Sequence, residues 1–193
     1  MTLSAAYSID TPGARRPTEI ASELGPIFAE RAEHTPDEDR FVAENYADLR
    51  SSGLIEAGVP VELGGSGADV DELAEMLRIL ARYCGSTALA FAMHTHQVAI
   101  PAWRWRHQKA MAVEPLLKRI AQERIVLISS GGSDWVGGSG KAEKVDGGYR
   151  ITARKIFSSG SPAGNLMMTG AVLQQDDEPP MVLHFGVPMN RRR

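Results

Sequence analysis

The sequence has 193 residues, 43% hydrophobic and 23% charged, which suits one large or two small folded domains and argues against disorder throughout. Its formal net charge is -3, with Lys+Arg 21 against Asp+Glu 24, so no basic excess favours nucleic acid or a membrane surface as a partner. The single cysteine, Cys84, excludes an internal disulfide and a cysteine-based metal site. With no signal-peptide pattern at the start, we expect a cytoplasmic protein.

The first part of the chain predicts helices. Residues 1–17 mix Ser, Gly, Pro and Arg without periodicity, and we expect them to form a mobile tail. Apolar residues then recur every three or four positions over residues 20–28 and again over residues 42–49, which indicates two amphipathic helices. The second of these helices is expected to stop at Gly53.

A glycine-rich loop precedes the next helix. Several glycines and a proline between Gly53 and Gly67 interrupt helical order and predict unusual backbone angles. Asp69 is a good N-cap for a third helix, because Glu72 stands three residues later as its capping-box partner. A fifth helix is expected over the apolar positions between residues 113 and 120.

The predicted fourth helix is apolar nearly all round, and Ser86 or Thr87 is expected to cap it. Residues 83–103 carry no formal charge and are long enough to span about 30 Å of hydrocarbon. The stretch also holds several hydroxyl, imidazole and amide groups, which favour burial in protein over burial in lipid. His94 and His96 lie two positions apart and point in different directions on a helix, so no metal site is expected.

Strands are predicted after Glu123. Residues 125–128 form a short apolar run, and residues 150–157 alternate in character, so one strand is expected to continue to Phe157. Asp146-Gly147-Gly148 is typical of a hairpin turn. Residues 166–173 and 181–187 predict two further strands, joined by a polar loop.

These patterns predict the α+β class, with an all-α helical domain followed by a partial β-barrel-like domain. We place the mobile tail at residues 1–17, the N-terminal helical domain at 18–123 and the middle β domain at 124–193. Four or five strands would leave two sheet edges unpaired, and the chain stops at Arg193 just after a strand. We therefore expect a chain that is truncated within its β domain.

Short motifs occur in both parts. Gly53-Leu54, Val59-Pro60 and Gly64-Gly65-Ser66-Gly67 follow one another in the helical part, and Lys155-Ile156-Phe157 follows the hairpin turn in the β part. They resemble the segments "GL", "VP" and "GGxG" and the "DGY…GxKxF/W" pattern of the acyl-CoA dehydrogenase superfamily. The resemblance runs from about residue 20 to residue 190.

The resemblance implies a bound FAD whose flavin ring lies against the β domain, where two segments contact it. The first segment carries "TEPxxGSD" in the family, and here only the "GSD" half is matched, by residues 132–134. On this basis Ser129 and Ser130 are candidate cofactor-binding residues, and Ser133 and Asp134 are candidate substrate-binding residues. No Rossmann or P-loop spacing supports the nearby glycines as phosphate binders.

The second implied segment contains Phe157, Ser158 and Ser159. Phe157 matches the aromatic position beside the flavin, and Ser159 matches the hydroxyl position near flavin N5. A flat aromatic ring and a hydroxyl suit a cofactor with an apolar face and a redox-active nitrogen. Without the resemblance, Phe157 would be interpreted as an ordinary core residue of a strand.

Three functions stay open. The first is an FAD-dependent acyl-CoA dehydrogenase of fatty acid metabolism, acting on the CH–CH group of an acyl thioester with an electron-transfer partner. Its catalytic base comes from a C-terminal helical domain in this family, and Glu123, Glu143 and Asp134 have no motif support as substitutes.

The second function is a two-component flavin-dependent monooxygenase, which uses FMN or reduced flavin from a flavin reductase. Phe157-Ser158-Ser159-Gly160 resembles the "FSSG" of that group at least as well as the dehydrogenase "WITNG". The third is a catalytically inactive short form that acts as an interaction module. The resemblance also implies a small-molecule substrate and a homo-oligomer for the full-length enzyme.

Overall fold

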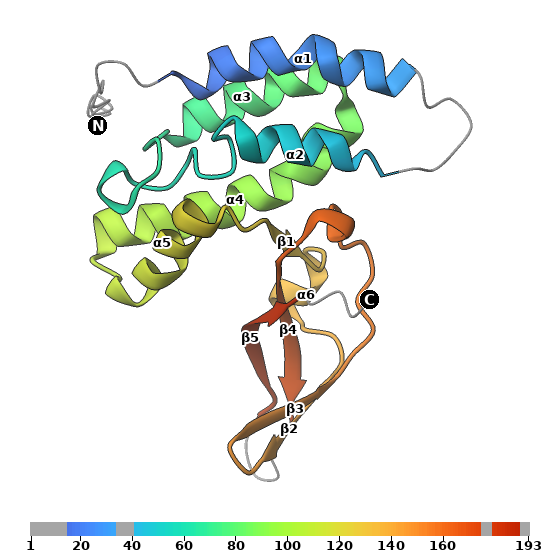
Figure 1. Ribbon diagram of the computed structural model, residues 1–193. Helices are drawn as coiled ribbons and strands as arrows, with labels where there is room; N and C mark the ends of the chain where they lie inside the picture. The colour runs from blue at the N-terminus through green and yellow to red at the C-terminus, as the bar shows by residue number, and fades with distance from the viewer. Residues whose placement is uncertain (1–14, 34–40, 175–178, 190–193) are drawn as a thin grey trace, which may run out of the picture. The chain divides into compact units, whose positions relative to one another are not determined.

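The computed structural model describes residues 15–33, 41–174 and 179–189. The chain divides into two compact units, residues 1–125 and residues 126–193, and the division lies two residues beyond the boundary placed after Glu123. The first unit is helical and the second is built on a sheet, which confirms the predicted α+β class (Figure 1). Residues 1–14 of the predicted tail lie outside the described residues, and the first helix already begins at Pro17.

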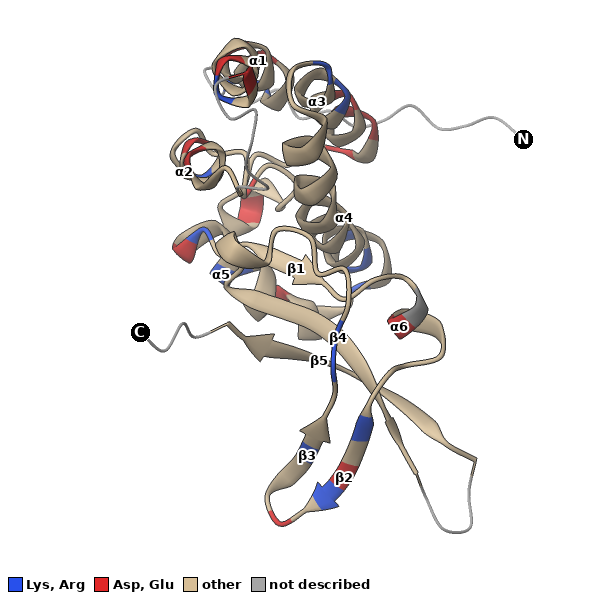
Figure 2. Cartoon of the chain, turned by 90° about the vertical axis from the view of Figure 1, so that its right-hand side faces the viewer, with Lys and Arg blue, Asp and Glu red and all other residues tan. Residues whose placement is uncertain are grey.

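Five α-helices form the described part of the first unit. Acidic and basic residues both lie along α1 and α3 (Figure 2). None of the helices within the described ranges is long and apolar enough to cross a membrane. The helices are α1 (Pro17–Glu33), α2 (Ala43–Ser51), α3 (Val70–Tyr83), α4 (Gly85–Gln108) and α5 (Glu114–Glu123), with short 3-10 turns at η1 (Val61–Leu63) and η2 (Met111–Val113).

The start of α3 agrees with the prediction. The Asp69 side chain accepts a hydrogen bond of 2.9 Å from the backbone N–H of Glu72, so Asp69 is the N-cap. Leu73, Met76 and Leu80 recur at helical spacing and are buried. The apolar stripe of α3 therefore faces the interior of the helical unit.

The start of α4 differs from the prediction, because neither Ser86 nor Thr87 is its cap. The helix begins at Gly85, after an extended Cys84 with φ -148° and ψ 94°. The Thr87 hydroxyl instead accepts a hydrogen bond of 2.9 Å from the Asn45 amide of α2 and lies 3.1 Å from the buried Cys84 sulfur. Thr87 thus links two helices, and sequence spacing alone does not reveal this contact.

The glycine-rich loop folds back on itself through backbone hydrogen bonds. Gly65 N–H donates to the Pro60 carbonyl at 3.2 Å, and Gly67 N–H donates to the Val59 carbonyl at 2.9 Å. A Cβ atom on Gly65 would lie 2.2 Å from the Val59 oxygen, so only glycine fits at this position.

His94 of α4 holds the same loop. Its Nε2 lies 2.8 Å from the Ile55 carbonyl oxygen, which can only accept, so Nε2 carries the proton. The ring stacks on Phe91 with centroids 5.5 Å apart. His94 is therefore a packed core residue, whereas His96 is exposed.

The second unit is a five-stranded mixed sheet with strand order β1-β4-β2-β3, and β5 pairs with β4. β4 is the central strand: it runs parallel to β1 at its start (Leu127↔Leu166), parallel to β2 at its end (Lys141↔Val172), and antiparallel to β5. The strands are β1 (Leu127–Ser129), β2 (Lys141–Val145), β3 (Gly148–Thr152), β4 (Leu166–Leu173) and β5 (Met181–Pro188), with α6 (Ser133–Val136) and η3 (Ser161–Ala163) between them.

The hairpin between β2 and β3 turns at Asp146-Gly147, as predicted. The prediction that this strand continues to Phe157 is wrong, because β3 ends at Thr152. Lys155 turns its side chain into the protein, and Phe157 adopts a φ of +60°, which a strand does not allow. Residues 175–178 of the predicted polar loop lie outside the described residues.

Replacing Gly65 tests the loop packing. We expect Gly65→Ala to lower the free energy of unfolding by about 1–3 kcal/mol, because the new methyl group must displace backbone atoms. Gly85→Ala is the matched control, since a Cβ there meets nothing within 4 Å. Urea denaturation followed by circular dichroism measures both, and equal midpoints for the two variants would contradict the packing.

Replacing His94 tests its burial. Burial lowers the pKa of His94 to about 4, from 6.5. Between these values the unfolded chain binds a proton that the folded chain does not, so stability falls as pH falls from about 6.5 to about 4, by up to roughly 3 kcal/mol. We expect urea midpoints of His94→Gln to change less over this range than those of the wild type, while His96→Gln behaves like the wild type. Parallel curves for all three proteins would refute the assignment.

Candidate functional site

Ser129 is the last residue of β1 and Ser130 follows it, at the beginning of the first predicted segment, and both side chains are buried. Trp135 Nε1 donates a hydrogen bond of 2.9 Å to Ser129 Oγ. Ser130 Oγ lies 2.6 Å from Thr169 Oγ1 on β4. Both hydroxyls therefore bond within the protein, and the cofactor contact predicted for Ser129 and Ser130 stays a prediction.

Gly131 and Gly132 form the open part of this segment. Gly131 has a φ of +56°, and a Cβ built there would find its nearest neighbour, the Ile156 carbonyl oxygen, 3.8 Å away. A Cβ on Gly132 would meet nothing within 4 Å. With no side chain in the way, another group can approach the backbone closely here. The side chain of Ser133, a predicted substrate contact, lies outside the described residues.

Phe157 is the most exposed residue among the predicted site residues that the structure describes, with 85% of its surface accessible. Its φ of +60° is a conformation that costs a residue with a side chain of order 1–2 kcal/mol. The carbonyl of Phe157 accepts a hydrogen bond of 3.0 Å from the N–H of Ser159, and Ser158 Oγ lies 3.7 Å from the Met167 sulfur. The turn thus presents a large aromatic ring to the outside on a strained backbone.

Asp134 and Lys155 form an ion pair between the two predicted segments. Asp134 Oδ2 lies 3.2 Å from Lys155 Nζ, and both side chains are less than a tenth exposed. Lys155 Nζ also donates to the carbonyl of Ser139 at 2.7 Å, to the Ser139 hydroxyl at 3.0 Å and to the carbonyl of Gly170 at 2.5 Å. Lys155 belongs to a motif of the sequence, but the motif alone predicted no role for it.

The charge state of Asp134 follows from these contacts. Burial by itself would raise the pKa of Asp134, but hydrogen bonds from Ser130, Ser139 and Lys155 outweigh burial and lower this pKa below its ordinary value. Asp134 is therefore an ionised internal partner of Lys155. The predicted substrate contact of Asp134 stays a prediction, and the geometry commits its carboxylate to the protein interior.

The other two carboxylates weighed as bases both lie in partly exposed ion pairs. Glu123 accepts from Arg119 at 3.0 Å, and Glu143 accepts from Lys141 at 2.8 Å. The hydrogen bond from Lys141 lowers the pKa of Glu143, which makes it a weaker base. Neither geometry supplies a catalytic base.

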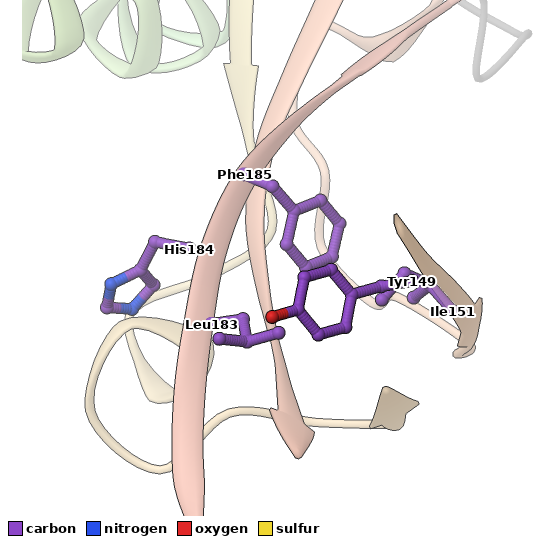
Figure 3. A pocket seen from close by; sticks show the side chains of 5 residues that line it. All are labelled: Tyr149, Ile151, Leu183, His184 and Phe185. Atoms are coloured by element: carbon purple, nitrogen blue, oxygen red, sulfur yellow. The ribbon is translucent and has the colours of Figure 1, made fainter. Parts of the chain in front are cut away.

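A hollow of about 340 Å³ lies between β3 and β5, lined by Tyr149, Ile151, Leu183, His184 and Phe185 (Figure 3). His184 lies on the opposite side of β5 from Phe185, and its ring is tilted against that of Trp135 with the centroids 5.0 Å apart. Leu183 and Phe185 pack on the small core formed by Ala142, Ala171 and Leu173. The hollow is therefore part of the apolar face of the sheet.

Comparisons with known proteins place these observations in a family. Residues 20–119, just over half of the chain, match the family described as acyl-CoA dehydrogenase, N-terminal domain. A pigment production hydroxylase of Rhodococcus sp. (strain ATCC 21145) is 28% identical over 165 residues, which cover 86% of this chain and 40% of the hydroxylase. A dibenzothiophene monooxygenase of Mycolicibacterium goodii is 30% identical over 166 residues, which cover 82% of this chain and 39% of the monooxygenase. The chain thus spans about 40% of the length of these relatives.

Two solved structures share the fold. A nitrososynthase from Micromonospora carbonacea var. africana superposes with a TM-score of 0.79 at 26% identity, over 92% of this chain and 46% of the nitrososynthase. KijD3, solved in complex with FMN and an amino-keto sugar nucleotide, superposes with a TM-score of 0.72 at 26% identity, over 94% of this chain and 46% of KijD3. As its motifs predicted, the chain belongs to the acyl-CoA dehydrogenase family.

Proposed function

We propose that the chain forms the flavin-facing part of a two-component flavin-dependent monooxygenase. The observation that carries the proposal is the exposed ring of Phe157, held on a left-handed backbone close to the open glycines of the first segment. A folded protein seldom holds a large aromatic side chain outward at a conformational cost unless something packs on it. A flavin ring is a flat group with an apolar face, and it fits such a surface.

The residues present suit a flavin in three ways. Phe157 offers a face for stacking, Gly131 and Gly132 leave open space beside the backbone, and Ser159 places a hydroxyl in the same turn as the aromatic ring. When bound, reduced flavin would supply the electrons that activate oxygen. The protein's own contribution is to orient the ring and to keep water from one of its faces.

Several observations favour a monooxygenase over the dehydrogenase that the motifs put first. The relatives include a hydroxylase and a dibenzothiophene monooxygenase, and the turn reads Phe157-Ser158-Ser159-Gly160 rather than "WITNG". The "TEP" half of the first dehydrogenase motif is missing.

This function implies a small organic substrate and a flavin reductase as partners. The KijD3 complex holds FMN, which favours FMN over the FAD that the family motifs suggested. Acyl-CoA dehydrogenation is the second candidate, and the family match of residues 20–119 favours it. An interaction module without catalysis is the third candidate, and a protein that binds no flavin would support it.

Activity assays separate the candidates. We expect the protein expressed from its complete reading frame to consume oxygen when supplied with a flavin reductase, NADH, FMN and a dibenzothiophene-type substrate, with hydroxylated or sulfoxidised product detected by mass spectrometry. Reductase and FMN without the protein are the control for uncoupled oxygen consumption. Reduction of an artificial electron acceptor by acyl-CoA, with no oxygenated product, would support the dehydrogenase instead.

Substituting Phe157 tests the flavin contact and the backbone strain together. We expect Phe157→Asn to weaken FMN binding and yet to raise the free energy of unfolding of the apo protein by about 0.5–1 kcal/mol, because Asn tolerates positive φ and the exposed ring loses little burial. The control is Ile156→Asn, a neighbouring exposed position without positive φ, which should not gain stability. Flavin titration and urea denaturation measure the two effects, and unchanged FMN affinity in Phe157→Asn would remove Phe157 from the site.

A further inference from the structure

Two motif residues that sequence reasoning treated separately meet inside the sheet unit. Asp134 closes the glycine segment that follows β1, and Lys155 stands two residues before Phe157. Their charged atoms lie 3.2 Å apart, and both side chains are less than a tenth exposed. The pair therefore connects the glycine segment after β1 with the chain just before Phe157. These are the two places where the proposed function puts the flavin contacts.

The lysine is held from several directions at once. Nζ donates to two oxygens of Ser139, in the connection before β2, and to the carbonyl of Gly170 at the middle of β4. A Cβ on Gly170 would lie 2.9 Å from the Asp134 carbonyl oxygen, so α6 also packs closely against β4. The position of Lys155 is thereby fixed relative to the central strand and to the glycine segment.

The conformation of the Phe157 turn, residues 156–160, depends on contacts other than those of the Phe157 ring. The ring is 85% exposed, so packing of the ring does not set its direction. On the downstream side the turn is tied by hydrogen bonds from Ser159 N–H to the Phe157 carbonyl and from Ser161 N–H to the Ser158 carbonyl. On the upstream side the nearest buried anchor is Lys155. A left-handed residue between two anchors keeps its conformation only while both hold.

We propose that Lys155 and Asp134 are positioning residues, which hold the Phe157 turn and the Gly131–Gly132 backbone in the arrangement that receives the flavin. This inference rests on the proposed function, which supplies the flavin as the ligand. It assigns no contact with the flavin to either charged group, because their charged atoms are turned into the protein interior. A purely structural pair would stabilise the fold without setting the geometry of the turn, and the two roles predict different results.

The test compares Lys155→Met, Asp134→Asn and the double variant with the wild type. Lys141→Met is the matched control, because Lys141 forms an ion pair with Glu143 on the exposed surface of β2. Ser139→Ala is a milder variant that keeps one of the two Ser139 acceptors. Three quantities are measured in each protein: the FMN dissociation constant, the urea midpoint, and the amide hydrogen exchange of residues 156–160 without flavin.

We expect both single variants to raise the FMN dissociation constant roughly tenfold, as loss of a supporting partner generally does at a bound group, and to accelerate exchange over residues 156–160. Ser139→Ala should raise it less, about twofold to threefold, since the hydroxyl's bonds to Lys155 and Asp134 are lost while the Ser139 carbonyl still accepts from Lys155. The double variant carries no lone buried charge, so it should recover part of the urea midpoint but not the FMN affinity. Lys141→Met should match the wild type in all three measurements.

The outcomes separate the two proposals. If the double variant recovers stability and FMN affinity together, or if exchange over residues 156–160 is unchanged in every folded variant, Lys155 and Asp134 are not positioning residues. If a single variant does not fold, Ser139→Ala and the double variant decide the question by the same criteria. If the wild type binds no flavin, the proposed function fails, while the exchange rates of the apo proteins still test whether the pair sets the turn.

Discussion

A lysine ammonium cannot stay charged inside a protein without acceptors around it, and in the sheet unit Lys155 has four, including the carboxylate of Asp134. These acceptors come from three parts of the chain: the connection before β2, the middle of β4 and the segment after β1. Reaching these acceptors turns the chain inward two residues before Phe157, where β3 would otherwise have continued. The exposed aromatic residue Phe157, with its positive φ, follows two residues later.

The helical unit contains a comparable constraint. The loop before α3 closes through its own backbone groups, with Gly65 pressed against the Val59 carbonyl and His94 donating to the Ile55 carbonyl. In both units a buried polar side chain bonds to backbone carbonyls: His94 of α4 to that of Ile55, and Lys155, from the segment after β3, to that of Gly170. Several of the motifs that resemble the family lie in these irregular segments.

Periodicity and capping predicted most of the regular elements, including the Asp69 cap and the strands at 166–173 and 181–187, because these depend on local pattern. The errors have nonlocal causes. Thr87 is drawn into a contact with Asn45 of another helix, and Lys155 leaves the strand pattern to reach β4 and Asp134. The candidate site was located to two segments by resemblance, but the buried state of the Ser129 and Ser130 hydroxyls required the structure.

Hydrogen exchange with and without flavin tests the central claim most directly, because it locates the bound ring on the chain. The account predicts that saturating FMN slows amide exchange in residues 129–134 and 156–160 of the protein expressed from its complete reading frame, and leaves β3 and the hollow beside Tyr149 and Phe185 unchanged. Protection centred on that hollow, or on the helical unit alone, with no change in the two segments, would contradict it.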